Sequence, residues 1–394
     1  MLIIDAHLDL AWNAMQWSRD LLQSVYTLRA REGRMSGDGR GQNTVSLPEL
    51  RRGHVALCFG TVLARVNERG VPDIDYASPA QAYAAARGHV AYYHALAQQG
   101  SIRLITSRTL LDAHLAEWEA WAKTKDDAAQ GVASGRRKDE WSTGDSPSSF
   151  IPHPSSFVSP SSFQTPPTGV VISMECADPI MFPDQVAEWY DAGLRLIGPG
   201  HYGRGRYVGG TGTDVGFNEA GIQLLNAMER SGIILDVTHL SDEAFWEAMS
   251  LYDGPILASH HNCRALAPHQ RQLSDEQIRA LIQRDAVIGA AFDVWMLIPD
   301  WSFGKSSNKQ VTIATVAEHI DHVCQIAGDS LHAAIGSDLD GGFGRESAPF
   351  DLDTIADVQR LAEALTEHNF ADDDIANVMY QNWLRLLRRA WREG

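Results

Sequence analysis

The segment Leu2-Ile3-Ile4-Asp5-Ala6-His7-Leu8-Asp9 is a short apolar run that ends on a histidine and a carboxylate, both of a kind that binds metal ions. Four later segments repeat this pattern: 170–174 before Glu175, 233–238 before His239, 255–259 before His260 and 333–337 before Asp338. A hydrophobic core has no reason to place such side chains at the same end of strand after strand. A parallel barrel does, because its strand ends meet at one rim.

The rest of the chain supports a barrel. Strand-like and helix-like segments alternate from residue 169 onward, which is typical of a parallel sheet with crossover helices. We therefore expect one distorted (β/α)8, TIM-like barrel of the metal-dependent hydrolase type over residues 1–394. The eight candidate strands are 2–6, 55–62, 170–174, 194–197, 233–238, 255–259, 286–291 and 333–337, and the main expected helices are 78–99, 217–231, 274–284, 313–327, 351–367 and 372–391.

Residues 124–168 do not fit this alternation. They are polar and irregular, and Pro-Ser-Ser-Phe occurs in them three times, at 147–150, 154–157 and 160–163. Such a composition cannot bury enough apolar surface to offset the entropy lost on ordering. We interpret the segment as a surface insertion within the barrel; the alternative is a segment that docks a partner.

Composition excludes several classes of function. A net charge of −17 argues against nucleic acid, whose phosphates require clustered basic residues. No apolar run is long enough to cross a membrane, and the first strand starts at Met1 without room for a secretory signal, so we expect a cytoplasmic protein. The scattered cysteines Cys58, Cys176, Cys263 and Cys324 have no metal or disulfide spacing and are expected to be free, buried thiols.

The strand-end residues indicate a metal centre. His7 and Asp9 are two apart on a strand and so point to the same side. A carboxylate such as Glu175 at the end of an apolar strand is costly unless it is paired or metal-bound, and His239 and His260 supply neutral imidazoles. These ligands are too many for one tetrahedral zinc, so we expect two zinc ions, with manganese or cobalt as substitutes. Asp338 lies nearest the end of the last strand and is our candidate for proton transfer, with Asp340 as its competitor.

In order along the chain, the segments Asp5–Asp9, Met174–Asp178, Ile234–Ser241, Ser259–Leu266 and Ile335–Gly341 resemble the membrane (renal) dipeptidase family, peptidase family M19 of the amidohydrolase-like superfamily. The resemblance implies that His7 and Asp9 bind one zinc, that His239 and His260 bind the other, and that Glu175 bridges both. A bridging hydroxide would attack the peptide carbonyl of a dipeptide, and Asp338 would pass its proton to the leaving amine. His201 would stabilise the oxyanion, and Arg271 would bind the substrate's C-terminal carboxylate. The resemblance also implies acceptance of a C-terminal D-residue and a homodimer.

The sequence departs from that family in places that leave the substrate open. Cys176 stands where glycine is usual, His261 replaces a small polar residue, and the segments 202–213 and 293–297 are atypical. One alternative is therefore a related amidohydrolase that acts on a lactam, a cyclic amide or an N-acyl amino acid. Another is a non-catalytic metal-binding protein that uses its insertion to dock a partner. Membrane anchoring is not expected.

Overall fold

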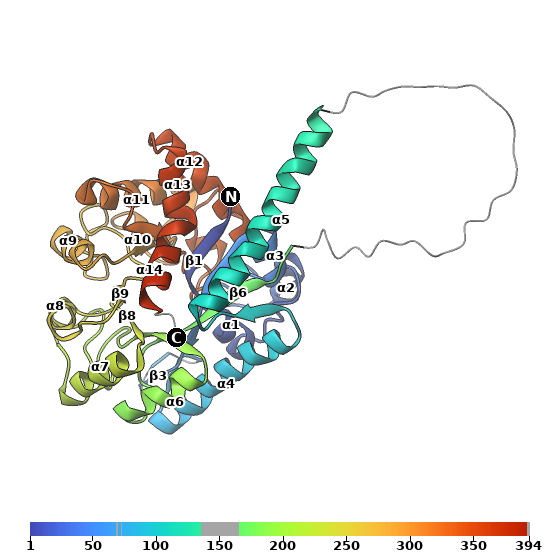
Figure 1. The fold of residues 1–394 in the computed structure, drawn as a ribbon. Helices are drawn as coiled ribbons and strands as arrows, with labels where there is room; N and C mark the ends of the chain where they lie inside the picture. Colours follow the sequence, from blue (N-terminus) through green and yellow to red (C-terminus); the bar gives the residue numbers. More distant parts are fainter. Residues whose placement is uncertain (68–69, 72, 135–164, 392–394) are drawn as a thin grey trace, which may run out of the picture.

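The computed structural model describes residues 1–67, 70–71, 73–134 and 165–391, and it confirms the predicted TIM-like barrel (Figure 1). All barrel strands are parallel and pair in the order β10-β11-β1-β2-β6-β7-β8-β9. One parallel bridge between Ala258 and Ile288 joins the two ends of this order, so the barrel is nearly closed. The strands are β1 (Ile3–Leu8), β2 (Val55–Leu63), β6 (Thr168–Glu175), β7 (Leu194–Gly198), β8 (Ile234–Asp236), β9 (Ile256–Leu257), β10 (Ile288–Ala290) and β11 (Ala333–Ile335).

Three short strands were not predicted. β5 (Ile102–Leu104) pairs with β6 outside the barrel order. β3 (Arg65–Val66) and β4 (Asp75–Tyr76) form a separate two-stranded ribbon just after β2. This ribbon follows the carboxyl end of a barrel strand, where the functional loops of such barrels lie.

Helices surround the strands (Figure 1). Two predicted helices are less regular than expected. Residues 351–354 are not helical, because Thr354 caps a 3₁₀ segment, Ile355–Arg360, that leads into α12. A π segment, Asn377–Gln381, separates α13 from α14. The helices are α1 (Leu10–Gln16), α2 (Val25–Glu32), α3 (Leu47–Arg52), α4 (Pro79–Gln98), α5 (Arg108–Ser134), α6 (Val186–Asp191), α7 (Glu219–Ser231), α8 (Asp242–Leu251), α9 (Asp275–Gln283), α10 (Val294–Leu297), α11 (Ile313–Ala327), α12 (Leu361–Glu367), α13 (Asp372–Ala376) and α14 (Asn382–Ala390).

The predicted insertion starts differently from our expectation. α5 continues to Ser134 and extends past the body of the barrel, so residues 124–134 are helical rather than irregular (Figure 1). The helix-forming run Lys-Thr-Lys-Asp-Asp-Ala-Ala-Gln at 123–130 accounts for this, since most of these residues have good helix propensity. Residues 135–164, which include the three Pro-Ser-Ser-Phe repeats, lie outside the described residues.

The alternation of side chains along β1 directs polar groups toward the site. Ile4 and Ala6 pack in one hydrophobic cluster with Trp118 of α5 and Trp383 of α14. The residues between and after them point the other way, because successive side chains of a strand alternate. This second face carries Asp5 and His7, and both side chains are buried.

Two buried aspartates connect neighbouring strand ends, and Gly336 allows two strand ends to approach closely. The Asp5 Oδ1 atom accepts hydrogen bonds from the backbone N–H groups of His7 (3.1 Å) and Ser337 (2.9 Å), which ties β1 to the segment after β11. Asp236 does the same between β8 and β9, through Thr238 and Ser259. A Cβ atom at Gly336 would lie only 1.7 Å from the backbone oxygen of Ser259. Glycine is therefore required where these strands approach each other.

Candidate metal centre and substrate pocket

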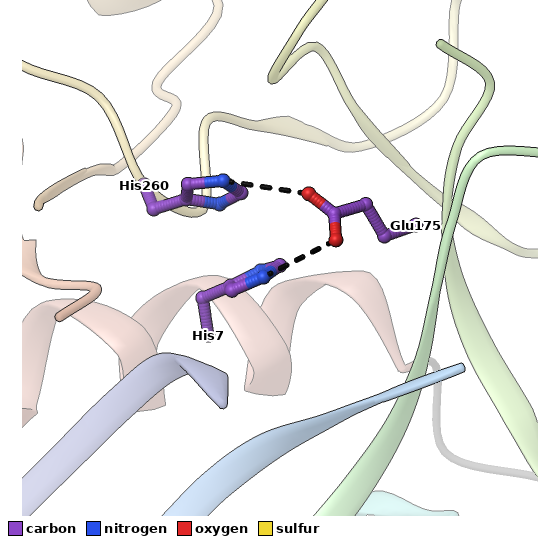
Figure 2. A group of neighbouring side chains, drawn as sticks. All are labelled: His7, Glu175 and His260. Carbon is purple, nitrogen blue, oxygen red and sulfur yellow. Dashed lines mark ion pairs between the residues drawn. The ribbon is translucent and has the colours of Figure 1, made fainter. Parts of the chain in front are cut away.

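The strand ends converge on one carboxylate, as the sequence predicts. Glu175, the last residue of β6, faces histidines from three other strand ends. Figure 2 shows two of them, His7 and His260, each paired with one of the two Glu175 oxygens. Its Oε2 atom is 3.5 Å from Nε2 of His7. Its Oε1 atom is 3.2 Å from Nε2 of His239 and 3.5 Å from Nε2 of His260. The two oxygens therefore face different histidines, which is the arrangement a bridging carboxylate needs.

Asp9 and Asp338 complete the His7 side of the cluster. Nε2 of His7 is 4.0 Å from Oδ1 of Asp9 and 3.7 Å from Oδ1 of Asp338. Asp9 immediately precedes α1 and accepts a hydrogen bond from the Thr61 hydroxyl of β2. Three sets of side chains have potential ligand atoms within 4.8 Å of one another: His7, Glu175 and His260; Glu175, His201 and His239; and His7, Asp9 and Asp338.

Hydroxyl groups contact the Nδ1 atoms of two of these imidazoles. The Nδ1 atom of His239 is 3.2 Å from the Thr211 hydroxyl, which also donates to the His239 carbonyl oxygen. The Nδ1 atom of His260 is 2.9 Å from the Ser259 hydroxyl. A hydroxyl can accept a hydrogen bond from Nδ1–H, and this tautomer leaves the Nε2 lone pair free for a metal ion.

The electrostatics of the cluster suit a cation. Burial alone would raise the pKa of Glu175, but the positive charge of His7 and further interactions hold that pKa well below its usual value. Burial would lower the pKa of His7, but Glu175, Asp338 and Asp9 raise it to about 10. Burial lowers the pKa values of His239 and His260, so both rings are neutral.

The donor set passes a simple test of fit to a metal ion. The Nε2 atom of His7 is buried and has no hydrogen-bond partner among the described residues. Such an orphaned nitrogen is costly unless a ligand completes it. Imidazole nitrogens with carboxylate oxygens and no thiolate match the preferences of zinc.

Asp338 and Asp340 have different surroundings although they follow the same strand. The carboxylate of Asp338 faces His7 and lines the central pocket. The carboxylate of Asp340 accepts hydrogen bonds from the backbone N–H groups of Thr44 and Val45 and lies 3.6 Å from the Arg19 guanidinium. Asp340 is thus engaged in packing the α2–α3 segment, and Asp338 is the carboxylate available to a substrate.

A cavity of about 670 Å³ opens over the cluster. This volume is within the usual range for small-molecule sites, about 300–1,000 Å³. Arg271 lines the cavity and is buried; its Nη2 donates to the His260 carbonyl oxygen at 3.0 Å, but Nε and Nη1 have no partner among the described residues. Much of the remaining wall is apolar or aromatic and includes Trp12, Trp295, Met296, Phe303 and Phe343.

His201 follows β7 and lies on the opposite side of Glu175 from His7. Its Nε2 atom is 3.6 Å from Oε1 of Glu175, and its ring centroid is 4.3 Å from that of His239. Burial lowers the pKa of His201 to about 4 despite the nearby Glu175, so the ring is neutral. All eight predicted site residues therefore line one pocket or belong to the cluster of candidate metal ligands beside it.

Sequence reasoning missed one charged pair at this site. Arg65 lines the cavity and donates from Nη1 to Nδ1 of His201 at 2.9 Å. Asp75 holds the other two guanidinium nitrogens, Nε at 2.6 Å and Nη2 at 2.8 Å. A signal was present, because Arg65 comes two residues after an apolar strand, as the ligands do.

The structure also shows the surroundings of two departures from the family pattern. Cys176 adopts a left-handed backbone with φ 71°, which glycine adopts without strain. Both ring nitrogens of His261 are buried without a hydrogen-bond partner among the described residues, and His261 does not line the cavity. All four cysteines are free and buried, as predicted.

Comparison with known protein sequences identifies a family. The family described as membrane dipeptidase (peptidase family M19) matches residues 162–392. An uncharacterized protein in the pqqA 5′ region of Klebsiella pneumoniae is 31% identical over 213 residues, which cover 52% of this chain and 75% of that protein. The uncharacterized dipeptidase C3A11.10c of Schizosaccharomyces pombe is 26% identical over 208 residues, 52% of this chain and 48% of that protein. The match thus spans about half the length of this fungal relative.

Solved structures share the fold along nearly the whole chain. The dipeptidase AC, a metallopeptidase of family M19, aligns with a TM-score of 0.68 at 20% identity and 99% coverage of both chains. A Rhodobacter sphaeroides metallopeptidase, liganded with a phosphinate mimic of the dipeptide L-Ala-D-Ala, aligns with a TM-score of 0.66 at 21% identity and the same coverage. At these identities the likeness establishes the fold. Over the described part of the chain, each helix is too short or too polar to span a bilayer.

Proposed function

This chain belongs to the membrane dipeptidase family, peptidase family M19, and we propose that it is a dipeptidase that hydrolyses the peptide bond of dipeptides at a two-zinc centre. One observation carries the proposal: the two oxygens of Glu175 are divided between His7 on one side and His239 and His260 on the other. A carboxylate placed in this way can serve two cations at once.

The proposed ligand sets follow from these distances. His7 and Asp9 would hold one zinc, His239 and His260 the other, and Glu175 would contribute to both. Manganese or cobalt could replace zinc, because the donor set contains no thiolate. When bound, the ions supply a water of lowered pKa and polarise the substrate carbonyl.

The surrounding side chains perform the remaining steps. Burial raises the pKa of Asp338 well above its usual value, so this carboxyl can hold a proton and deliver it to the leaving amine. His201 would donate a hydrogen bond from Nε2 to the carbonyl oxygen as negative charge develops there. The unpartnered N–H groups of Arg271 would bind the C-terminal carboxylate of the substrate.

The direct test measures the release of amino acids from a dipeptide panel by zinc-loaded protein. We expect turnover by the wild type and a loss of at least about 100-fold in kcat for Asp338→Asn. Asp184→Asn is the matched control, since Asp184 is a surface carboxylate with an 85% exposed side chain. Equal rates for Asp338→Asn and wild type would remove Asp338 from the mechanism. No turnover by folded, metal-loaded wild type would refute the dipeptidase proposal.

The panel includes L-Ala-L-Ala and L-Ala-D-Ala, because we extend the proposal to C-terminal D-residues. The ligand of the Rhodobacter metallopeptidase motivates this choice. Cleavage of L-Ala-L-Ala with no cleavage of L-Ala-D-Ala would refute this extension.

The second candidate, hydrolysis of an N-acyl amino acid, a lactam or a cyclic amide, is favoured by the wide aromatic cavity. Trp12, Trp295 and Phe303 give it an apolar wall that could pack against an acyl group. Activity on N-blocked amides without activity on free dipeptides would support this candidate over the first. The homodimer and the cytoplasmic location stay predictions.

A further inference from the structure

His201 differs from His239 and His260 in the group that contacts its Nδ1 atom. Nδ1 of His201 is 2.9 Å from Nη1 of Arg65, whereas hydroxyls lie behind His239 and His260. A guanidinium group has only donors and stays protonated in proteins. The Nδ1 atom of His201 must therefore accept this hydrogen bond and cannot carry a proton.

The tautomer of His201 follows from this contact. A neutral imidazole has one N–H group, so the proton must be on Nε2. That atom points toward Glu175, at 3.6 Å from Oε1. A protonated Nε2 can donate a hydrogen bond, but it has no lone pair with which to bind a metal ion.

The same chain contains an independent example of this arrangement. Nη1 of Arg103 lies 3.0 Å from Nδ1 of His114, and Nε2 of His114 lies 2.7 Å from the carbonyl oxygen of Ala56. A carbonyl oxygen can only accept, so His114 carries its proton on Nε2 while Nδ1 accepts from an arginine. His114 does not line the cavity and provides an internal reference for this tautomer.

The arginine itself is held rigidly. Two nitrogens of Arg65 bind both oxygens of Asp75, whose side chain is only 2% exposed. The backbone N–H group of Val71 also donates to the Asp75 carboxylate, at 2.5 Å. With Nε and Nη2 engaged by Asp75, Nη1 is directed at His201.

We propose that Arg65, anchored by Asp75, is a positioning residue that fixes His201 as an Nε2–H donor and so keeps it out of the metal coordination. His201 lies as close to Glu175 as the three histidine ligands do, so distance alone does not separate its role from theirs. Arg65 makes the difference by dictating which nitrogen is protonated. This role rests on the proposed dipeptidase function, but the tautomer can be measured without any activity.

The first test records proton–nitrogen correlation spectra of the histidine side chains, in metal-free and zinc-loaded full-length protein. His201→Gln identifies the His201 signals, and His114 supplies the reference. We expect His201 to show the Nε2–H tautomer in both states and to keep its nitrogen shifts when zinc is added. An Nδ1–H tautomer, or a His201 nitrogen that shifts on zinc binding as the ligand nitrogens do, would overturn the proposal.

The second test uses Arg65→Met, with Arg103→Met as the matched control. Without the donor, we expect the His201 signals to become those of a tautomer mixture and kcat to fall about 100-fold, the usual cost of losing one oxyanion donor, while KM changes less than about threefold. Arg65→Lys should recover part of this loss, and Arg103→Met should leave kcat unchanged.

A double-mutant cycle separates positioning from general structural damage. In the His201→Gln background, Arg65→Met should cost little further activity, because its effect passes through His201. Additive losses in the double variant would refute the positioning role, even if the wild type is a dipeptidase. If no dipeptide is cleaved but the tautomer is as stated, the proposed function fails while the assignment of His201 as a non-ligand stands.

Discussion

Replacing Arg271 with methionine should separate substrate binding from stability. Methionine keeps much of the apolar stem but removes the guanidinium, whose Nε and Nη1 have no partner among the described residues. Removing one member of a buried charged pair costs about 2–5 kcal/mol of the binding free energy. For a dipeptide with a free C-terminal carboxylate, this corresponds to a loss of about 30- to 4,000-fold in kcat/KM. Most of the loss should appear in KM, because the carboxylate is bound in the ground state and in the transition state alike.

The same substitution should change stability little. It removes one charge-assisted hydrogen bond, from Nη2 to the His260 carbonyl oxygen at 3.0 Å, worth about 1.5–3 kcal/mol. It also removes two buried N–H groups without partners, and each such group costs about 1–3 kcal/mol. These opposing contributions are comparable, so we expect the Tm of the metal-loaded variant to stay within a few degrees of the wild-type value.

The assay compares each dipeptide with its C-terminal amide. Wild type should prefer the free acid by the factor given above, and Arg271→Met should lose that preference. The control is Arg264→Met: Arg264 lies in the same loop but binds Asp242 at 2.7 Å, so its loss should lower Tm and leave the preference intact. If Arg271→Met reduced hydrolysis of acid and amide equally, the carboxylate-binding role of Arg271 would be wrong.

Three further outcomes are expected. The carboxylates around His7 raise its pKa to about 10, so the metal-free ring is protonated at neutral pH. Because zinc must displace that proton, the apparent zinc affinity should rise with pH through the neutral range. Calorimetry in buffers of different ionisation enthalpy measures the proton release. An affinity independent of pH would contradict this. Gly336→Ala places a Cβ atom 1.7 Å from the Ser259 backbone oxygen and should destabilise the fold by about 3 kcal/mol or more in denaturant titrations. Gly88→Ala is the control inside α4, because the new Cβ atom would meet only the Met15 side chain, at 3.8 Å. It should stabilise the fold by about 0.5–1 kcal/mol. Replacing residues 135–164 by a short Gly/Ser linker should leave dipeptide hydrolysis unchanged, since every described site residue lies outside this segment; a loss of turnover by the folded variant would assign the insertion a role.

The repeated strand-end pattern predicted most of the site because its signals are local. A run such as Val170–Met174 forms a buried strand from its own side chains, and a carboxylate or histidine directly after it must lie at the rim. The same rule applies to His7, His239 and His260, and it needs no knowledge of the neighbours of these residues. α5 was not among the expected helices: residues 124–134 are polar enough to be interpreted as loop, although most residues at 123–130 have good helix propensity.

The sequence by itself determined the barrel and the set of side chains that surround Glu175, because apolar periodicity and strand order are properties of the chain. Only the tertiary structure distinguishes the surroundings of Asp338 from those of Asp340. The two carboxylates are chemically identical and two residues apart in the sequence. They differ because Asp340 is surrounded by Thr44, Val45 and Arg19, which are distant from it along the chain. The tautomer proposed for His201 depends on tertiary structure in the same way. Nothing in its own segment shows which ring nitrogen carries the proton, because that depends on a guanidinium 136 residues away.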